Sequence, residues 1–236
     1  MNFAAILAGG HGTRMGATDK PKQFQLLGER PILVHTLEKF ALMDEFERVL
    51  LLCPVEWVEA SRDLLKMHLP AQSEKIVVLA GGATRSGTVQ NAIAWIEENY
   101  ETDENTVIVT HDSVRPFVTY RIIKDNLEAL ANYDACDTVI PASDTIVVSE
   151  GGTEIDSIPL RSTMFQGQTP QSFRLLALKE VYEQLSGDEE AQLTDACKAF
   201  VLRGRPVALV NGEPFNIKIT YPVDLRIAHA LLGQYE

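Results

Sequence analysis

Short apolar runs alternate with amphipathic helical patterns through the first 141 residues, and this alternation constrains the fold more than any other feature. The runs that read as buried strands are residues 2–7, 49–53, 76–79, 106–110 and 138–141. Between them, apolar side chains recur at three- and four-residue spacing in residues 32–40, 58–67, 88–98 and 122–132. Strands that alternate with helices indicate a Rossmann-like α/β fold, a mostly parallel sheet with helices on both faces. In such sheets ligands bind outside the carboxyl ends of the strands.

The alternation ends after Pro141. Residues 145–148 and 155–158 flank a Ser-Glu-Gly-Gly turn and predict a β-hairpin. Two strands alone are marginally stable, so we expect an arm at about 142–170 that packs against a second copy of the chain. Beyond it the pattern predicts helices at 175–185, 195–202 and 223–232, and strands at 207–210 and 216–219. The chain, residues 1–236, reads as one domain with a projecting arm.

A glycine-rich loop follows the first strand. It contains Gly9, Gly10, Gly12 and Gly16, with Arg14 and Lys22 as its cations. Glycines let backbone N–H groups approach an anion closely, so the loop suits a nucleoside triphosphate. A P-loop is excluded because no Gly-Lys pair occurs, and the dinucleotide fingerprint fails because its third glycine comes one residue late. A plain surface turn is the alternative.

A second loop, residues 81–88, leaves the third strand and enters a helix. Thr88 is the expected N-cap, and a helix N-terminus favours an anion or a hydrogen-bond acceptor. We expect this loop to close over the base or ribose, with Arg85 shaping the loop or touching the ligand. The alternative is an ordinary strand-to-helix turn.

Polar residues also follow the fourth strand. Asp112 is placed to bind Mg²⁺ together with substrate phosphates, and Arg115 to grip a second phosphate. An Asp112–Arg115 ion pair that closes a turn is the alternative, and His111 is given no catalytic role. Lys218 lies in an apolar strand pattern, where its neighbours would be buried, so it too is expected to meet an anion.

Composition excludes several classes of protein. The net charge of −12 argues against a general nucleic-acid binder, since phosphate backbones repel such a surface. Cys53, Cys136 and Cys197 are far apart, without metal or disulfide spacing, and read as reduced core residues. No secretion signal and no apolar run long enough for a membrane are recognised, so we expect a cytoplasmic protein without a membrane partner.

These motifs together resemble one family, the cytidylyltransferases that activate polyol phosphates. The matching segments run through nearly the whole chain in the family's order: residues 7–23, 81–88, 111–116, 168–173, 194–195 and 216–220. Within the family, Ser113-Val114 and the segments 164–171 and 193–198 are closer to the ribitol 5-phosphate branch of teichoic acid and cell wall synthesis. The 2-C-methyl-D-erythritol 4-phosphate branch of isoprenoid synthesis is the alternative.

The resemblance implies a nucleotidyltransferase sheet, a homodimer and a role for each matched residue. Catalysis would fall to Arg14, Lys22 and Lys218, around the α-phosphate of CTP. CTP would contact Leu7, Ala8, Gly9, Gly10, Gly12, Thr13, Gly82, Arg85 and Thr88. The acceptor would contact Asp112, Ser113, Arg115, Arg161, Thr169 and Thr194, with Asp112 also holding Mg²⁺. Arg161 and Thr169, carried by a swapped arm, would reach the site of the neighbouring subunit.

The implied reaction is CTP plus ribitol 5-phosphate giving CDP-ribitol and pyrophosphate. A phosphate monoester is largely dianionic at neutral pH, so its attack needs no general base. A glycosyltransferase would want an Asp-x-Asp motif, which the sequence lacks. A nucleotide-sensing protein would bind CTP without releasing pyrophosphate.

Overall fold

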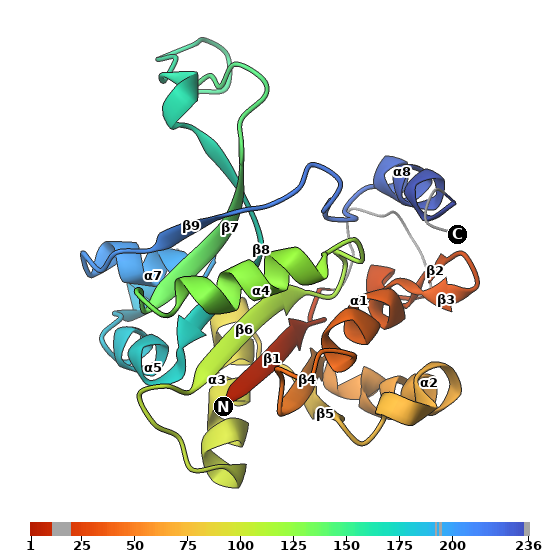
Figure 1. The fold of residues 1–236 in the computed structure, drawn as a ribbon. Coiled ribbons are helices and arrows are strands. Elements are labelled where there is room, and N and C mark those ends of the chain that lie inside the picture. The colour runs from red at the N-terminus through yellow and green to blue at the C-terminus, as the bar shows by residue number, and fades with distance from the viewer. Residues whose placement is uncertain (11–19, 192, 194, 234–236) are drawn as a thin grey trace.

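The computed structural model describes residues 1–10, 20–191, 193 and 195–233, and its described part is built on a seven-stranded sheet (Figure 1). The strand order is β5-β4-β1-β6-β8-β7-β9. In chain order these strands are β1 (Asn2–Leu7), β4 (Arg48–Cys53), β5 (Ile76–Ala80), β6 (Val107–Asp112), β7 (Ala135–Pro141), β8 (Phe165–Arg174) and β9 (Ala208–Asn211). Neighbours are parallel except where β8 pairs with β6 and β7. The expected mostly parallel sheet is confirmed.

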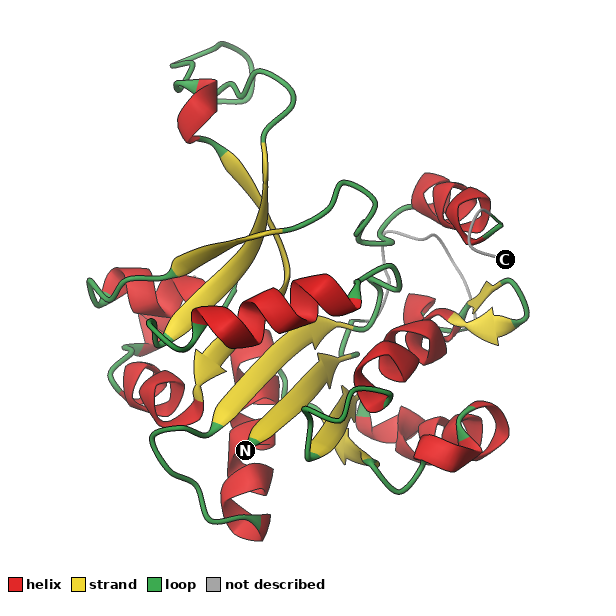
Figure 2. Ribbon diagram, in the orientation of Figure 1, coloured by secondary structure: helices red, strands yellow, loops and turns green. Residues whose placement is uncertain are grey.

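Helices cover both faces of this sheet (Figure 2). One face packs against α1 (Ile32–Ala41), α2 (Val58–His68) and α4 (Tyr120–Ala129), and the other against α3 (Arg85–Asn99), α5 (Leu175–Glu183) and α7 (Cys197–Leu202). A short α6 (Gly187–Ala191) follows α5, and α8 (Pro222–Leu232) lies beside a small hairpin of β2 (Leu26–Leu27) and β3 (Arg30–Pro31). Among the described residues, no helix combines the length and apolar character needed to cross a bilayer.

Burial explains why the central strands are read so easily from sequence. β1 is covered on both faces, and its residues Phe3 to Ile6 are fully buried. A strand buried on both faces is nearly continuously apolar rather than alternating. All three cysteines are likewise buried free thiols, and burial raises the pKa of Cys136 to about 12. The expectation of reduced core cysteines is confirmed.

β8 is the element that the sequence pattern did not predict. Its ten residues include Gly167, Pro170 and three glutamines, and they show no apolar alternation. Residues 168–173 of the strand are buried, and their polar side chains find hydrogen-bond partners: Gln168 donates to the Glu213 carbonyl, and Ser172 donates to Asn126. Buried polar groups are tolerated when they are hydrogen-bonded in this way.

Two expected strand regions differ in the structure. Residues 145–148 and 155–158 are joined by one antiparallel bridge, Val148 to Ser157, and not by a ladder. Residues 216–219 form no strand and lie outside the sheet, where the Ile219 N–H donates to the Val114 carbonyl. Both segments have too few backbone partners to form strands. The segment between β7 and β8 extends beyond the end of the sheet (Figure 1).

Candidate active site

A cavity of about 300 Å³ opens at the carboxyl ends of β1 and β6. Ten residues that the sequence predicted for the site line it together: Leu7, Gly9, Gly10, Lys22, Gly82, Arg85, Thr88, Asp112, Ser113 and Lys218. Gln23, Ala83, Thr84 and Val114 line it as well and were not predicted. Segments far apart in sequence therefore meet where a parallel sheet binds its ligands.

The glycine loop is anchored at its two described ends. Gln23, in the 3₁₀ turn η2 (Lys22–Phe24), donates from Nε2 to the Ala8 carbonyl at 2.6 Å. Lys22 donates from Nζ to the Ile219 carbonyl at 3.1 Å, and its side chain is buried. The predicted residues Gly12, Thr13 and Arg14 lie outside the described residues.

Hydrogen bonds of two threonines stabilise the second loop, residues 81–88. Thr84, not Thr88, caps α3, because its Oγ1 accepts from the Gly87 N–H at 3.0 Å. The Thr88 hydroxyl lies inside the first turn, where it donates to the Thr84 carbonyl and accepts from the Gly82 N–H. A Cβ on Gly82 would lie 2.5 Å from the Gly87 carbonyl carbon, so only glycine fits there. The Thr-x-x-Gly spacing marks this cap in the sequence.

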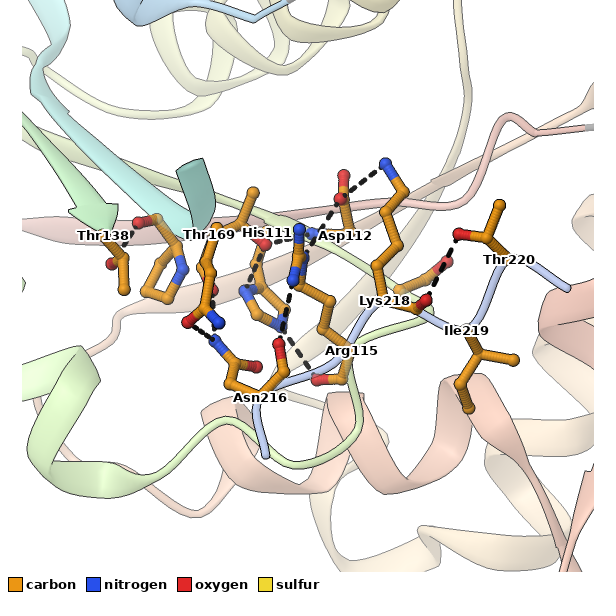
Figure 3. A network of polar contacts seen from close by, with 12 residues as sticks. His111, Asp112, Arg115, Thr138, Thr169, Asn216, Lys218, Ile219 and Thr220 are labelled. Carbon is orange, nitrogen blue, oxygen red and sulfur yellow. Dashed lines mark hydrogen bonds and ion pairs between the residues drawn. The ribbon is translucent and has the colours of Figure 1, made fainter. Parts of the chain in front are cut away.

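Asp112 lies at the centre of a cluster of cations. Its Oδ1 accepts from Arg85 Nη1 at 2.7 Å, and its Oδ2 lies 2.9 Å from Lys218 Nζ and 3.5 Å from Arg115 Nε. Figure 3 shows Lys218 and Arg115 directed toward this carboxylate. Burial alone would raise the pKa of Asp112, but the three positive charges lower it well below its usual range. The Asp112–Arg115 ion pair that the sequence left open is present.

His111 holds the strand end rather than taking part in proton transfer. Burial lowers its pKa to about 4, so the ring is neutral at pH 7. The hydrogen bonds assign its tautomer: Nε2 donates to the Arg115 carbonyl, and Nδ1 accepts from Thr169 Oγ1 at 2.9 Å (Figure 3). The Thr169 hydroxyl in turn accepts from the Asp112 N–H at 3.1 Å. Both ring nitrogens are therefore engaged.

The remaining predicted residues lie in other places. Arg115 is buried beneath the cavity, where Nη1 donates to the Asn216 carbonyl. Thr169 lies in β8 beside Asp112 of its own chain, so its expected place on a swapped arm is wrong. Arg161 is exposed on the projecting segment, where it donates to the Ser143 carbonyl. Thr194 lies outside the described residues.

The donor set for a metal ion is small. Among the described residues, no group of three or more His, Cys, Asp or Glu side chains could hold one. Asp112 is the one acid among the described residues that line the cavity, and cations already contact both of its oxygens. This set fits Mg²⁺ only when phosphate oxygens supply most of the ligands, which is how Mg²⁺ is usually bound with nucleotides.

The charge balance indicates what the cavity can bind. Among the described residues that line it, Lys22, Arg85 and Lys218 face one carboxylate, that of Asp112, in a chain whose net charge is −12. A local excess of positive charge, with backbone N–H groups from glycine loops, suits a polyanion. It also suits a reaction in which negative charge accumulates on phosphate oxygens.

Comparisons with known proteins give a consistent result. Residues 3–234 match the family described as 2-C-methyl-D-erythritol 4-phosphate cytidylyltransferase. A curated relative, the ribitol-5-phosphate cytidylyltransferase of Lactiplantibacillus plantarum, is 48% identical over 232 residues, which cover 98% of each chain.

Solved structures of similar proteins share the fold. The 2-C-methyl-D-erythritol 4-phosphate cytidylyltransferase of Francisella tularensis superposes with a TM-score of 0.79 at 27% identity, covering 98% of this chain and 99% of that one. The 4-diphosphocytidyl-2C-methyl-D-erythritol synthase of Anaerococcus prevotii gives 0.80 at 24% identity, covering 98% and 96%, which supports the fold alone.

Proposed function

Because the chain belongs to the 2-C-methyl-D-erythritol 4-phosphate cytidylyltransferase family, and is therefore an enzyme of the cytidylyltransferase type, we propose that it converts CTP and D-ribitol 5-phosphate into CDP-ribitol and pyrophosphate. The family membership supports the transfer of a cytidylyl group. The relative that is 48% identical over 98% of the chain supports ribitol 5-phosphate as the acceptor. The observation that carries the reaction is the cavity in which Lys22, Arg85 and Lys218 meet Asp112.

In this proposal an oxygen of the acceptor phosphate attacks the α-phosphorus of CTP. The bond from that phosphorus to the oxygen of the β-phosphate breaks, and pyrophosphate leaves with the electron pair. Lys22 and Lys218 stabilise the charge on the α-phosphate, and the glycine loop with Arg14 holds the rest of the triphosphate. The loop of Gly82, Arg85 and Thr88 binds the nucleoside.

No side chain has to remove a proton, because the acceptor phosphate, with a second pKa of about 6, is already largely dianionic at neutral pH. This agrees with the state of His111, whose two ring nitrogens are engaged and whose pKa is lowered to about 4 by burial. Catalysis then rests on positioning and on charge stabilisation.

Mg²⁺ is part of the proposal as the cofactor that enters with CTP, with Asp112 as its candidate protein ligand. When bound, it neutralises phosphate charge. Asp112 would hold the metal through a carboxylate oxygen, and a cation displaced from that oxygen, Arg85 or Lys218, would become available to phosphate oxygens.

The test is pyrophosphate release with CTP and two acceptors. The purified enzyme should release pyrophosphate in proportion to ribitol 5-phosphate, with a much lower kcat/KM for 2-C-methyl-D-erythritol 4-phosphate. The erythritol-type acceptor is the second candidate, supported by the name of the matching family. A reversed preference would replace the first candidate by the second. No release with either acceptor would refute the proposal.

The active unit in this proposal is a homodimer formed through the 142–164 segment. This segment exposes Val147, Val148, Ile155, Ile158 and Leu160, each between 40% and 70% exposed. Exposed apolar side chains that gather on one segment favour a protein contact. Arg161 lies on the same segment, and the resemblance implies that the contact brings it to the acceptor site of the partner.

Mixed dimers test this shared site. A chain carrying Arg161→Ala and a chain carrying Lys218→Met are each expected to be nearly inactive. Random mixing should restore about one quarter of wild-type turnover, since half of the dimers are mixed and each then holds one intact site. Well-folded mixed dimers without activity would refute the sharing.

Three free buried thiols are typical of a reducing compartment and support a cytoplasmic enzyme. The product would serve teichoic acid and cell wall synthesis, as the resemblance to the ribitol branch implies.

A further inference from the structure

Asp137 is a carboxylate that neither the fold nor the proposed reaction accounts for. It lies in β7, directly opposite Gln171 of β8, which is itself opposite Thr110 of β6. Residues in register across a sheet present their side chains on the same face, and so do residues two apart along a strand. Asp137 and Asp112 therefore share the face that α3, α5 and α7 cover, separated by two strand spacings of about 4.8 Å each.

The side chain of Asp137 is held on one oxygen only. Oδ1 accepts from Gln171 Nε2 at 3.0 Å, and among the described residues no donor is bonded to Oδ2. Oδ2 faces Gly167, where even an added Cβ would approach no closer than 3.5 Å. The glycine thus leaves space in front of the free oxygen, and Asp137 lines an open hollow of about 650 Å³.

Gln171 supplies a second, independent observation. Its side chain is buried, and its Oε1 has no hydrogen-bond partner among the described residues. The Gln171 amide therefore donates to Asp137 through its NH₂ group, while its own carbonyl oxygen, Oε1, stays unpaired. A buried unpaired acceptor lowers the stability of the fold. Such a cost is expected where the side chain serves a function, and not where it makes a purely structural contact.

The charges around Asp137 indicate which part of a ligand it can meet. No cation forms an ion pair with it among the described residues, although Lys198 and Arg205 line the same hollow. Burial raises the pKa of Asp137, and Asp195 raises it further, while Arg115 and Arg85 lower it. The unpaired carboxylate oxygen of Asp137 repels phosphate oxygens, whereas hydroxyl groups can donate to it. The phosphates belong at the cationic cavity around Asp112, two strands away.

We propose that Asp137, oriented by Gln171, accepts hydrogen bonds from hydroxyl groups at the end of the acceptor remote from its phosphate, and so selects unbranched, hydroxyl-rich polyol phosphates. This inference rests on the proposed function. An acceptor with a missing or displaced hydroxyl leaves Oδ2 desolvated and unpaired, which is how polar sites reject analogues. Asp137 is then a specificity-determining residue that takes no part in bond making.

The experiment compares Asp137→Asn with wild type on two acceptors, ribitol 5-phosphate and its analogue that lacks the terminal hydroxyl. Wild type should prefer ribitol 5-phosphate by at least tenfold in kcat/KM, chiefly through KM, as expected for a hydrogen bond to a charged group. Asp137→Asn should reduce this preference severalfold or more and leave the Kd for CTP unchanged. Asp125→Asn is the matched control, because Asp125 pairs with Arg121 on α4 and neither residue lines the hollow or the cavity; its preference should equal that of wild type.

Each outcome bears on a separate claim. If wild type does not release pyrophosphate with ribitol 5-phosphate, the proposed function fails before Asp137 is tested. If wild type does so and Asp137→Asn lowers activity equally on both acceptors, or changes nothing, the selection by Asp137 is refuted. A Kd for CTP that changes as much as the KM for the acceptor would also refute it.

Discussion

Replacing Lys218 by methionine removes one positive charge from the reaction centre and keeps the length of the side chain. Lys218 Nζ lies 2.9 Å from Asp112 Oδ2, and its side chain is 41% exposed. The buried carboxylate of Asp112 keeps its contacts with Arg85 and Arg115 in this variant, so it stays paired and the variant should still fold. Any large effect on turnover then reports on the reaction.

The size of that effect follows from the charge that Lys218 would meet. Two unit charges about 4 Å apart interact by about 4 kcal/mol at an effective dielectric constant of about 20. Losing one preorganised electrostatic donor typically costs about 3–4 kcal/mol in the transition state. Lys218→Met should therefore lower kcat by about 10²–10³-fold.

The assay is pyrophosphate release at saturating CTP and ribitol 5-phosphate, with urea unfolding as the check on folding. Lys124→Met is the control, since Lys124 forms an exposed pair with Glu45 at 3.3 Å outside the cavity. The control should keep wild-type turnover. A kcat within threefold of wild type in folded Lys218→Met would refute the role of this lysine.

Three further predictions concern Asp112, Asp137 and the N-caps of two helices. Because the pKa of Asp112 is lowered in the folded state, its carboxylate stabilises the fold above the unfolded pKa of about 3.9, and this stabilisation is lost in acid. The unfolding free energy of Asp112→Asn in urea should therefore depend less on pH than that of wild type below pH 5. Parallel curves would contradict this. Burial raises the pKa of Asp137 to about 6, so ionising this carboxylate lowers the stability of the fold as pH rises from 4 to above 6. Relative to wild type, the unfolding free energy of Asp137→Asn should rise by up to about 3 kcal/mol between pH 4 and 7.5. No rise would contradict the cost of burying the carboxylate. Thr84→Ala and Thr119→Ala each remove the N-cap of a helix, and each should lower the unfolding free energy by about 1 kcal/mol. The KM for CTP should rise only in Thr84→Ala, because the loop of Thr84 lines the cavity. An equal rise in both variants would contradict the role of that loop.

The parallel part of the fold could be predicted because burial on both faces leaves a simple pattern. β1 and β4 are nearly continuous apolar runs, β6 begins with one at residues 107–109, and the helices between them keep a regular apolar spacing. β8 could not be predicted, because its polar residues are buried by specific partners such as Asn126, Asn216 and Asp137. Those partners come from distant parts of the chain, and no local pattern encodes them.

The candidate site likewise has a part that could be predicted from the sequence and a part that could not. Glycines and cations at strand ends could be found because a parallel sheet brings those ends together. Apart from the Asp112–Arg115 pair, the network of Asp112 could not be found, since its contact with Lys218 depends on a segment outside the sheet. Asp137 was missed because a single acid in a strand carries no motif; the signal lies in its unpaired oxygen and in Gln171.

The central claim is that the cavity activates the α-phosphorus of CTP toward the phosphate of the acceptor. Ribitol 5-phosphate labelled with ¹⁸O in its phosphate tests this claim directly, with ³¹P NMR of the product. The account predicts that the oxygen bridging the two phosphorus atoms of CDP-ribitol carries the label and that unlabelled pyrophosphate is released. An unlabelled bridging oxygen would mean that the phosphorus of the acceptor is attacked instead, and would contradict the account.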